Sequence, residues 1–230
     1  MDFGERAAID AWRRLAGAPR DGRLQVVVNR ESWLAPRGWI GIVAIGDVIT
    51  ASVPTAELRA PVESALAGFA GEQATDPDLV VPRLTATAAT LGPAQLFYPT
   101  ATFEAAGEIG DEASEAELAQ LLAASSPKDL DESGLAHIDS TAFVSRSSDG
   151  VIVSASGYRR WPNGAAHLSV LTHPEHRRRQ HGRRAAAAAA RHALEEGLLP
   201  QWRARPVASQ HLALAIGFVR VGAQLSVQPA

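Results

Sequence analysis

The residues with the clearest chemical meaning are a run of arginines that leads into a run of alanines. Five arginines fall within the eight residues from Arg177 to Arg184, around one glycine, Gly182, and six consecutive alanines fill positions 185–190. The first turn of a helix carries unpaired backbone N–H groups and the positive end of the helix dipole, so it attracts an anion. Alanine is the strongest helix former and has a small side chain. The run predicts a phosphate-binding loop at the start of a slim helix, with Gly182 letting a ligand approach the backbone.

The segments around this loop, which must position it, alternate between strand and helix patterns. Three strands are expected before the loop, over 141–147, 151–160 and 165–172. After the alanine-rich helix, a strand is expected over 200–207, a helix over 209–216 and a last strand or strand pair over 218–228. An Asp-Gly pair at 149–150 predicts a tight hairpin between the first two strands. Gly197 is expected to end the alanine-rich helix. Upstream, 114–117 has the spacing of a capping box before a helix that Pro127 stops, and a short second helix is expected within 129–138.

The order of these elements resembles the Gcn5-related N-acetyltransferase (GNAT) superfamily. The elements are the hairpin, the strand AHLSVLT, the loop HPEHRRRQHG, the helix, a strand and a helix ending in AIGF. The resemblance covers about 137–228 and extends to the helix pair from residue 112. In that family the strand ends in a hydrophobic-x-P-E segment, and the backbone amides of a following R-G-x-G-x-G/A loop hold the pyrophosphate of acetyl-CoA. Arg177 takes the initial Gln/Arg position of that motif and Gly182 its final Gly/Ala position. Gln180 stands where the family usually has glycine.

The resemblance implies a donor site for acetyl-CoA as cosubstrate, with no metal, and a small-molecule or peptide amine as the acceptor. The strand end would offer backbone groups to the pantetheine arm, and the loop would hold the pyrophosphate. A small polar residue near the start of the last helix would lie beside the cosubstrate. The residues expected to bind acetyl-CoA are Val170, Leu171, Thr172, Arg177, Arg178, Arg179, Gln180, His181, Gly182, Arg183 and Ser209.

Transfer to an amine requires a base for the amine proton, a hydrogen-bond donor for the tetrahedral oxyanion and a proton for the departing thiolate. Many members of the family place a glutamate base early in the strand before the loop and a tyrosine acid on the final helix. The matching residues here are Ala166 and Ala213. Three nearby residues are the expected substitutes. Glu132 lies in the segment that walls the acceptor site in the family, His167 adjoins the lost base position with an ordinary pKa suited to proton transfer, and Tyr158 on the preceding strand could supply a hydroxyl. Strand alternation points the His167 side chain away from the face of the lost base.

The first half of the chain predicts a separate lobe in which no ligand-binding motif is recognised. Helices are expected over 5–17, 55–70 and 77–91, and strands over 24–28, 39–53 and 94–103. The second of these strands is expected to break at a turn near Gly46 and Asp47. The expected fold class is α/β in the α+β sense, with an additional lobe at 1–108, conceivably a degenerate copy of the same fold, and a GNAT acetyltransferase domain at 109–230.

Composition and charge limit the class of protein. The chain has 230 residues, a formal net charge of -3 and no cysteine, which excludes disulfides and thiolate metal sites. No stretch reaches the roughly 18 apolar residues of a membrane helix, and the first residues lack a signal-peptide core, so a cytoplasmic protein without membrane contact is expected. Between Glu104 and Glu132 nine acidic residues stand against one base, Lys128. One face of the molecule is therefore expected to suit a cation and another an anion.

Two other functions remain open at this point. The missing base and acid are also what a catalytically silent acyl-CoA-binding or regulatory module would show. Clustered arginines can bind nucleic-acid phosphates, but the acidic net charge and the lack of interleaved aromatic residues disfavour nucleic acid as a partner. The sequence does not identify the acceptor, and it leaves the oligomeric state open, with a homodimer as one option.

Overall fold

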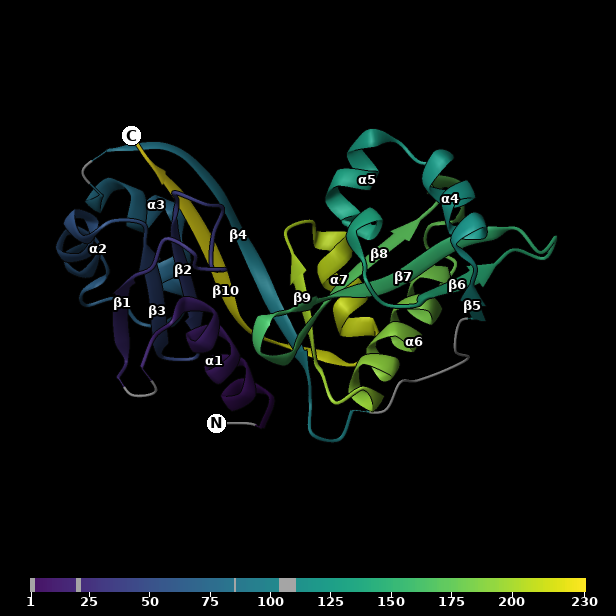
Figure 1. The fold of residues 1–230 in the computed structure, drawn as a ribbon, viewed down its shortest axis with the longest axis horizontal. Coiled ribbons are helices and arrows are strands. Elements are labelled where there is room, and N and C mark those ends of the chain that lie inside the picture. Colours follow the sequence, from purple (N-terminus) through teal and green to yellow (C-terminus); the bar gives the residue numbers. More distant parts are fainter. Residues whose placement is uncertain (1–2, 20–21, 85, 104–110) are drawn as a thin grey trace. The chain divides into compact units, whose positions relative to one another are not determined.

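The computed structural model describes residues 3–19, 22–84, 86–103 and 111–230, which form two compact units (Figure 1). The N-terminal unit consists of Met1–Tyr98 together with Ala204–Val207 and Arg220–Ala230. The C-terminal unit consists of Pro99–Arg203 and Ala208–Val219. The boundary predicted at 108/109 lies outside the described residues, so that division stays a prediction.

The N-terminal unit is built on one sheet whose strands lie in the order β1, β3, β2, β10 and β4. Its strands are β1 (Leu24–Val28), β2 (Ile40–Ile45), β3 (Val48–Val53), β4 (Thr87–Pro99) and β10 (Phe218–Pro229), and its helices are α1 (Phe3–Ala16), η1 (Ala56–Leu58), α2 (Arg59–Leu66), η2 (Gly71–Thr75), α3 (Pro77–Val80) and η3 (Val81–Arg83). The turn predicted near Gly46 is confirmed, since β2 and β3 pair antiparallel on either side of it. Apolar side chains of α2, such as Val62 and Leu66, pack on the sheet and close the core.

Two predictions in this unit are wrong. The helix expected over 77–91 is only four residues of α3 followed by η3, and β4 already begins at Thr87. Pro82 lacks a backbone donor, and Thr87 and Thr90 are β-branched residues that favour a strand, so the helical spacing of the alanines does not prevail. The strand expected over 94–103 ends at Pro99.

The C-terminal unit has its own sheet, with strands in the order β9, β8, β7, β6 and β5. Its strands are β5 (Asp111–Ala113), β6 (Ala142–Arg146), β7 (Ile152–Trp161), β8 (Ala165–Thr172) and β9 (Leu199–Ala204). Its helices are α4 (Glu115–Ala123), α5 (Pro127–Ser133), η4 (Leu135–His137), η5 (Pro162–Gly164), η6 (Pro174–His176), α6 (His181–Glu195) and α7 (Val207–Ala215). Neighbouring strands are antiparallel except β8 and β9, which are parallel.

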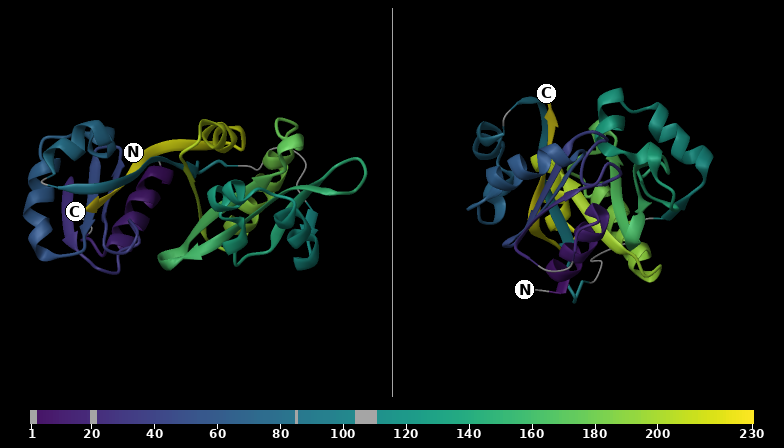
Figure 2. Two further views of the ribbon diagram at one scale, coloured as in Figure 1. Left: turned by 90° about the horizontal axis from the view of Figure 1, so that it is seen from above. Right: turned by 60° about the vertical axis from the view of Figure 1, so that its left-hand side comes forward.

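The two faces of this sheet are covered by different helices (Figures 1 and 2). Side chains of β6, β7 and β8 on one face, including Val144, Ala155 and Leu171, pack with Leu121 of α4 and Leu135 of η4. We call this the α5 face, because α5 contacts β8 on it. The alternate side chains, such as Tyr158, meet α6 on the other face, which we call the α6 face. Strand alternation thus sorts every residue of β7 and β8 to one helix layer or the other.

The predicted local signals of this unit are confirmed. Ser114 and Glu117 form the capping box at the start of α4, and the hairpin between β6 and β7 turns at Gly150. Hydrogen bonds from Ser114 and an ion pair with Arg146 at 2.7 Å lower the pKa of Glu117 to about 2. Within the described residues, no helix is both long enough and apolar enough to cross a membrane.

Candidate functional site

The arginine loop joins β8 to α6 through two residues in the left-handed backbone conformation. Arg178 has φ 62° and Gln180 has φ 64°. Gln180 is the N-cap residue of α6, at the position where the resembled family usually has glycine. Glycine adopts this conformation without steric cost, whereas another residue pays about 1–2 kcal/mol for it. The backbone therefore keeps a glycine-like shape at Gln180 although the side chain has changed.

Gly182 is explained by contacts inside the protein. A Cβ atom at this position would lie 2.9 Å from Oγ1 of Thr172 and 3.4 Å from Cδ2 of Leu212. The sequence suggested that the glycine admits a ligand, but the neighbours that a side chain would meet belong to β8 and α7. Behind it, all six alanines of 185–190 are buried in α6, so the predicted slim helix is confirmed.

A set of hydroxyl groups lies beneath the loop on the α6 face. Oγ of Ser154 lies 2.8 Å from Oγ1 of Thr172, and Oγ of Ser145 lies 2.8 Å from Nδ1 of His181. Burial is the main reason that the pKa of His181 lies below its usual value. The serines were not predicted as site residues, although their alternation in SAS of β7 marked a polar pattern on one face. Ser145 ties the first turn of α6 to the sheet, and Ser154 joins β7 to the end of β8.

The arginines of the loop divide into two kinds. Arg177 is held by the protein, because its Nε donates to the carbonyl of Thr172 at 3.2 Å and its Nη2 pairs with Asp129 of α5 at 2.7 Å. Hydrogen bonds from Ser126 and Arg177 lower the pKa of Asp129. Arg178 and Arg179 are exposed and make no hydrogen bond or ion pair with the described residues. The side chains of these two arginines are therefore available for a phosphate.

Strand β8 separates from β9 along the segment that leads to the loop. The pairing covers only three residues, ending at His167 and Gln201, whereas β8 pairs with β7 up to Thr172. The backbone of 168–172 on the side of β9 therefore has no strand partner among the described residues, and Val170, Leu171 and Thr172 lie there. Near it, the indole of Trp202 donates to Oγ of Ser209 at 3.0 Å and fixes the start of α7.

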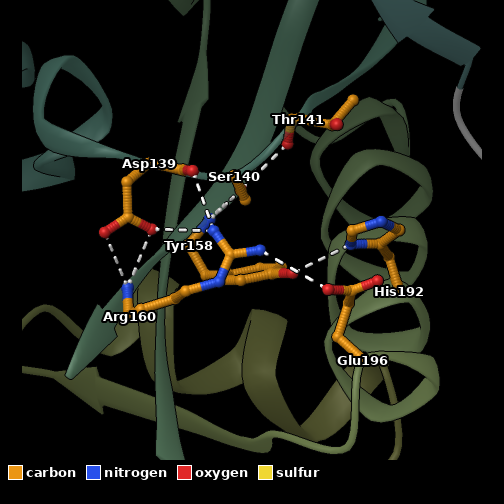
Figure 3. Close-up of polar contacts among 7 residues, drawn as sticks. All are labelled: Asp139, Ser140, Thr141, Tyr158, Arg160, His192 and Glu196. Carbon is orange, nitrogen blue, oxygen red and sulfur yellow. Dashed lines mark hydrogen bonds and ion pairs between the residues drawn. The ribbon is translucent and has the colours of Figure 1, made fainter. Parts of the chain in front are cut away.

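Tyr158 lies on the α6 face and is fully buried. Its hydroxyl hydrogen-bonds Nδ1 of His192 in α6 at 2.9 Å, and burial raises the pKa of the phenol (Figure 3). Ala166 and Ala213, at the positions where the resembled family carries its base and acid, are buried as well. Alanine carries neither a carboxylate nor a phenol, so these two positions themselves supply no base and no acid.

Figure 3 also shows an ionic network that sequence reasoning missed. Arg160 stands opposite Ala166 in the register of β7 and β8. Its guanidinium lies 3.4 Å from a carboxylate oxygen of Asp139 and 3.6 Å from one of Glu196. These three charges come from segments far apart in the sequence, so no local pattern announced them. Through Arg160, this network lies beside the position of the missing base.

His167 and Glu132 lie on the α5 face. A Cβ atom at Gly134, which ends α5, would lie 3.3 Å from Oγ of Ser169, and Ser169 shares its face of β8 with His167. Glu132 is exposed on α5. Burial, and secondarily the charges of Arg203 and Arg159, lower the pKa of His167 to about 3, so the imidazole is neutral at neutral pH. The sequence prediction that His167 points away from the face of Ala166 agrees with this placement.

Part of the C-terminal unit is similar to a known protein family. Residues 140–223 match a family model described as GNAT acetyltransferase. This match supports the GNAT superfamily for the C-terminal part of the chain. A search of curated proteins finds no match.

Solved structures agree with the GNAT assignment at the level of fold. A GNAT-family acetyltransferase of Novosphingobium aromaticivorans described as putative aligns with a TM-score of 0.50 and 18% identity over 61% of this chain and 65% of its own. A GNAT-family acetyltransferase of Colwellia psychrerythraea aligns with a TM-score of 0.50 and 15% identity over 66% of this chain and 60% of its own. The chain thus spans less than two thirds of either protein. The predicted mixed α/β class with a GNAT fold is confirmed.

Proposed function

We propose that this protein is an N-acetyltransferase that moves the acetyl group of acetyl-CoA directly to a primary amine. The observation that carries the proposal is the separation of β8 from β9 immediately before the arginine loop and α6. One element supplies unpaired strand backbone for an amide-containing arm, and the next supplies helix N–H groups and arginines for phosphates. Together they fit the two chemical parts of CoA in their covalent order.

On the donor side, Arg178, Arg179 and the first turn of α6 would hold the pyrophosphate. Val170, Leu171 and Thr172 would hydrogen-bond the pantetheine arm through their backbone, with Ser209 nearby. Arg177 has a different part in this proposal, because its two contacts anchor the loop to the end of β8 and to α5.

On the acceptor side, the amine nitrogen attacks the thioester carbonyl, and collapse of the tetrahedral intermediate breaks the C–S bond. The ammonium form gives up two protons. One goes to Glu132 through water before the attack, and the second leaves the nitrogen as the C–N bond forms and ends on the departing thiolate, so CoA leaves as the thiol. Exposed Glu132 attracts the ammonium form and takes its first proton through water. His167 offers a hydrogen bond from an imidazole that stays neutral near pH 7. Alignment of the two substrates supplies much of the rate. Tyr158 faces the other helix layer, so we assign its hydroxyl to the core rather than to the reaction.

Calorimetric titration of the full chain with acetyl-CoA tests the donor site. Binding is expected, and it is expected to weaken about tenfold or more when Arg178 and Arg179 are both replaced by alanine, since each loses a charge-assisted contact. Arg191→Ala on the outer side of α6 is the matched control and should bind as the unchanged protein does. Absence of binding in the unchanged protein would remove the proposal.

Acceptor-dependent thiol release then tests the transfer. The chain has no cysteine, so a thiol reagent reports only the CoA that is released. A rate that depends on an added amine supports the enzyme.

A catalytically silent acyl-CoA-binding module is the second candidate, and a specific observation favours it. Buried alanines, Ala166 and Ala213, stand at the positions of the usual base and acid. Acetyl-CoA binding without acetylation of any amine in a broad panel would select this candidate over the enzyme.

A further inference from the structure

A cluster of basic and aromatic side chains on the α5 face has no part in holding CoA. The cluster consists of Arg159, Trp161, His167 and Arg203, which we call the basic-aromatic cluster. The rings of Trp161 and His167 contact each other with their centroids 4.8 Å apart and their planes tilted by 35°, and the guanidinium of Arg203 lies 5.5 Å from the centroid of Trp161. Arg159 stands directly opposite His167 in the register of β7 and β8. Three strands thus contribute to one local group.

The electrostatics of the cluster favour a negative ligand. His167 is kept neutral partly by the positive charges of Arg203 and Arg159, which shows that both act on the same small region. Nδ1 of His167 is buried and has no hydrogen-bond partner among the described residues. An unmatched polar atom beside two guanidinium groups is a place where a bound acceptor group gains hydrogen bonds and charge pairing together.

The position of the cluster relates it to the transfer reaction. His167 and Gln201 form the last pair before β8 and β9 separate, and the acyl arm is assigned to the segment immediately beyond them. Glu132 on α5 lies on the same face, so this face carries a negative charge as well as the positive charges of Arg159 and Arg203. Charges of both signs on one face match a small molecule with an ammonium group at one end and an anion at the other.

We infer that the acceptor is an amine that carries a carboxylate, as a free amino acid does, and that Arg159 and Arg203 bind the carboxylate while the amine faces the point where β8 and β9 separate. Guanidinium groups pair with carboxylates through two parallel hydrogen bonds, which also orients the rest of the molecule. The rings of Trp161 and His167 form the surface against which the carbon chain rests. This inference rests on the proposed acetyl transfer.

The test uses matched acceptor pools and the full chain. One pool contains the common amino acids without cysteine, and the other contains the amines that remain when their carboxylates are removed, at equal total concentration with saturating acetyl-CoA. We expect thiol release to be at least about tenfold faster with the amino acids, the gain of one charge-assisted pair. Equal or faster release with the amines would overturn the inference. Faster release with phosphoethanolamine than with the amino acids would also overturn it, in favour of a phosphate.

Variants connect the preference to the named residues. Arg159→Gln, at an exposed position where folding is not at risk, and the double variant Arg159→Gln with Arg203→Gln should bring the ratio between the two pools close to one. The KM for acetyl-CoA should stay unchanged in both. Arg191→Gln, which removes an arginine that pairs with Glu195 on α6, should keep the full preference. An unchanged ratio in the folded Arg159→Gln and double variants would exclude the cluster as the carboxylate site.

Failure of the proposed function can be told apart from failure of this inference. If acetyl-CoA binds and neither pool is acetylated, the protein is not the enzyme proposed above. Saturation-transfer NMR of the amino-acid pool with CoA-loaded protein then decides the carboxylate site. Amino-acid signals that disappear in Arg159→Gln support the site, and the absence of any signal from the unchanged protein overturns it.

Discussion

The α6 face and the α5 face of the C-terminal sheet differ in what holds them together. On the α6 face, buried alanines bring α6 close to the sheet, Ser145 hydrogen-bonds His181 of α6, and Gly182 is explained by packing. On the α5 face, a small apolar core gives way to exposed carboxylates and the basic-aromatic cluster. Close packing fixes the shape of the arginine loop, whereas the α5 face carries charges that packing does not dictate. Under the proposed function, the rigid face would bind the common donor, and the other face would set the selectivity for the acceptor.

The largest effect is expected from crowding the α6 face. Gly182→Val should lower the free energy of unfolding by about 2–3 kcal/mol, because its side chain must displace Thr172 and Leu212. Urea denaturation measures the loss. Thr172→Ala in the same chain should restore part of it, because it removes the nearest contact. Fully additive losses would show that this contact is not what requires the glycine.

His167 on the α5 face should make the stability of the protein depend on pH in the acid range. His167 takes up a proton near pH 6.5 in the unfolded chain and only near pH 3 in the folded one. Stability is therefore lost as the pH falls through this window, by at most about 1.4 kcal/mol per pH unit from this group. His167→Asn should flatten the curve of melting temperature between pH 6.5 and 3. The same slope in both proteins would mean that His167 is not kept neutral by its surroundings.

A milder change separates structure from chemistry on the α6 face. Tyr158→Phe removes the hydrogen bond to His192 and should cost about 1 kcal/mol of stability. The rate of acetyl transfer at saturating substrates should stay within about twofold, because the hydroxyl faces away from the acceptor side. If the folded variant transfers acetyl groups more than about tenfold more slowly, Tyr158 takes part in the reaction, and the assignment of the reaction to the α5 face is contradicted.

The smallest effect concerns the backbone of the loop. Gln180→Gly relieves the left-handed conformation at φ 64° but adds freedom to the unfolded chain. These opposing terms leave a gain of up to about 1 kcal/mol in the free energy of unfolding. Gln180→Ala is the control, since it keeps the strained conformation and should bring no gain. A loss in Gln180→Gly would indicate that the glutamine side chain itself stabilises the loop.

Local signals predicted the C-terminal unit well because each is a property of neighbouring residues. The capping box at Ser114, the turn at Gly150 and the alanine-rich helix all depend on contacts within a few positions. The helix expected over 77–91 was wrong, because Pro82 lacks a backbone donor and the β-branched threonines that follow it favour a strand. Arg160 with Asp139 and Glu196, and the pairing of Arg203 with Trp161, join distant segments, so they had no local signature. The roles of Glu132 and of the CoA-binding residues stay predictions.

A crystal structure of the full chain with CoA bound tests the central claim most directly. The account predicts that the pyrophosphate lies on the loop at Arg178 and Arg179 against the first turn of α6. The pantetheine arm should run along 168–172 of β8, and the sulfur should point toward the α5 face near His167. CoA phosphates bound elsewhere, or a sulfur that points into the α6 face near Tyr158, would contradict it.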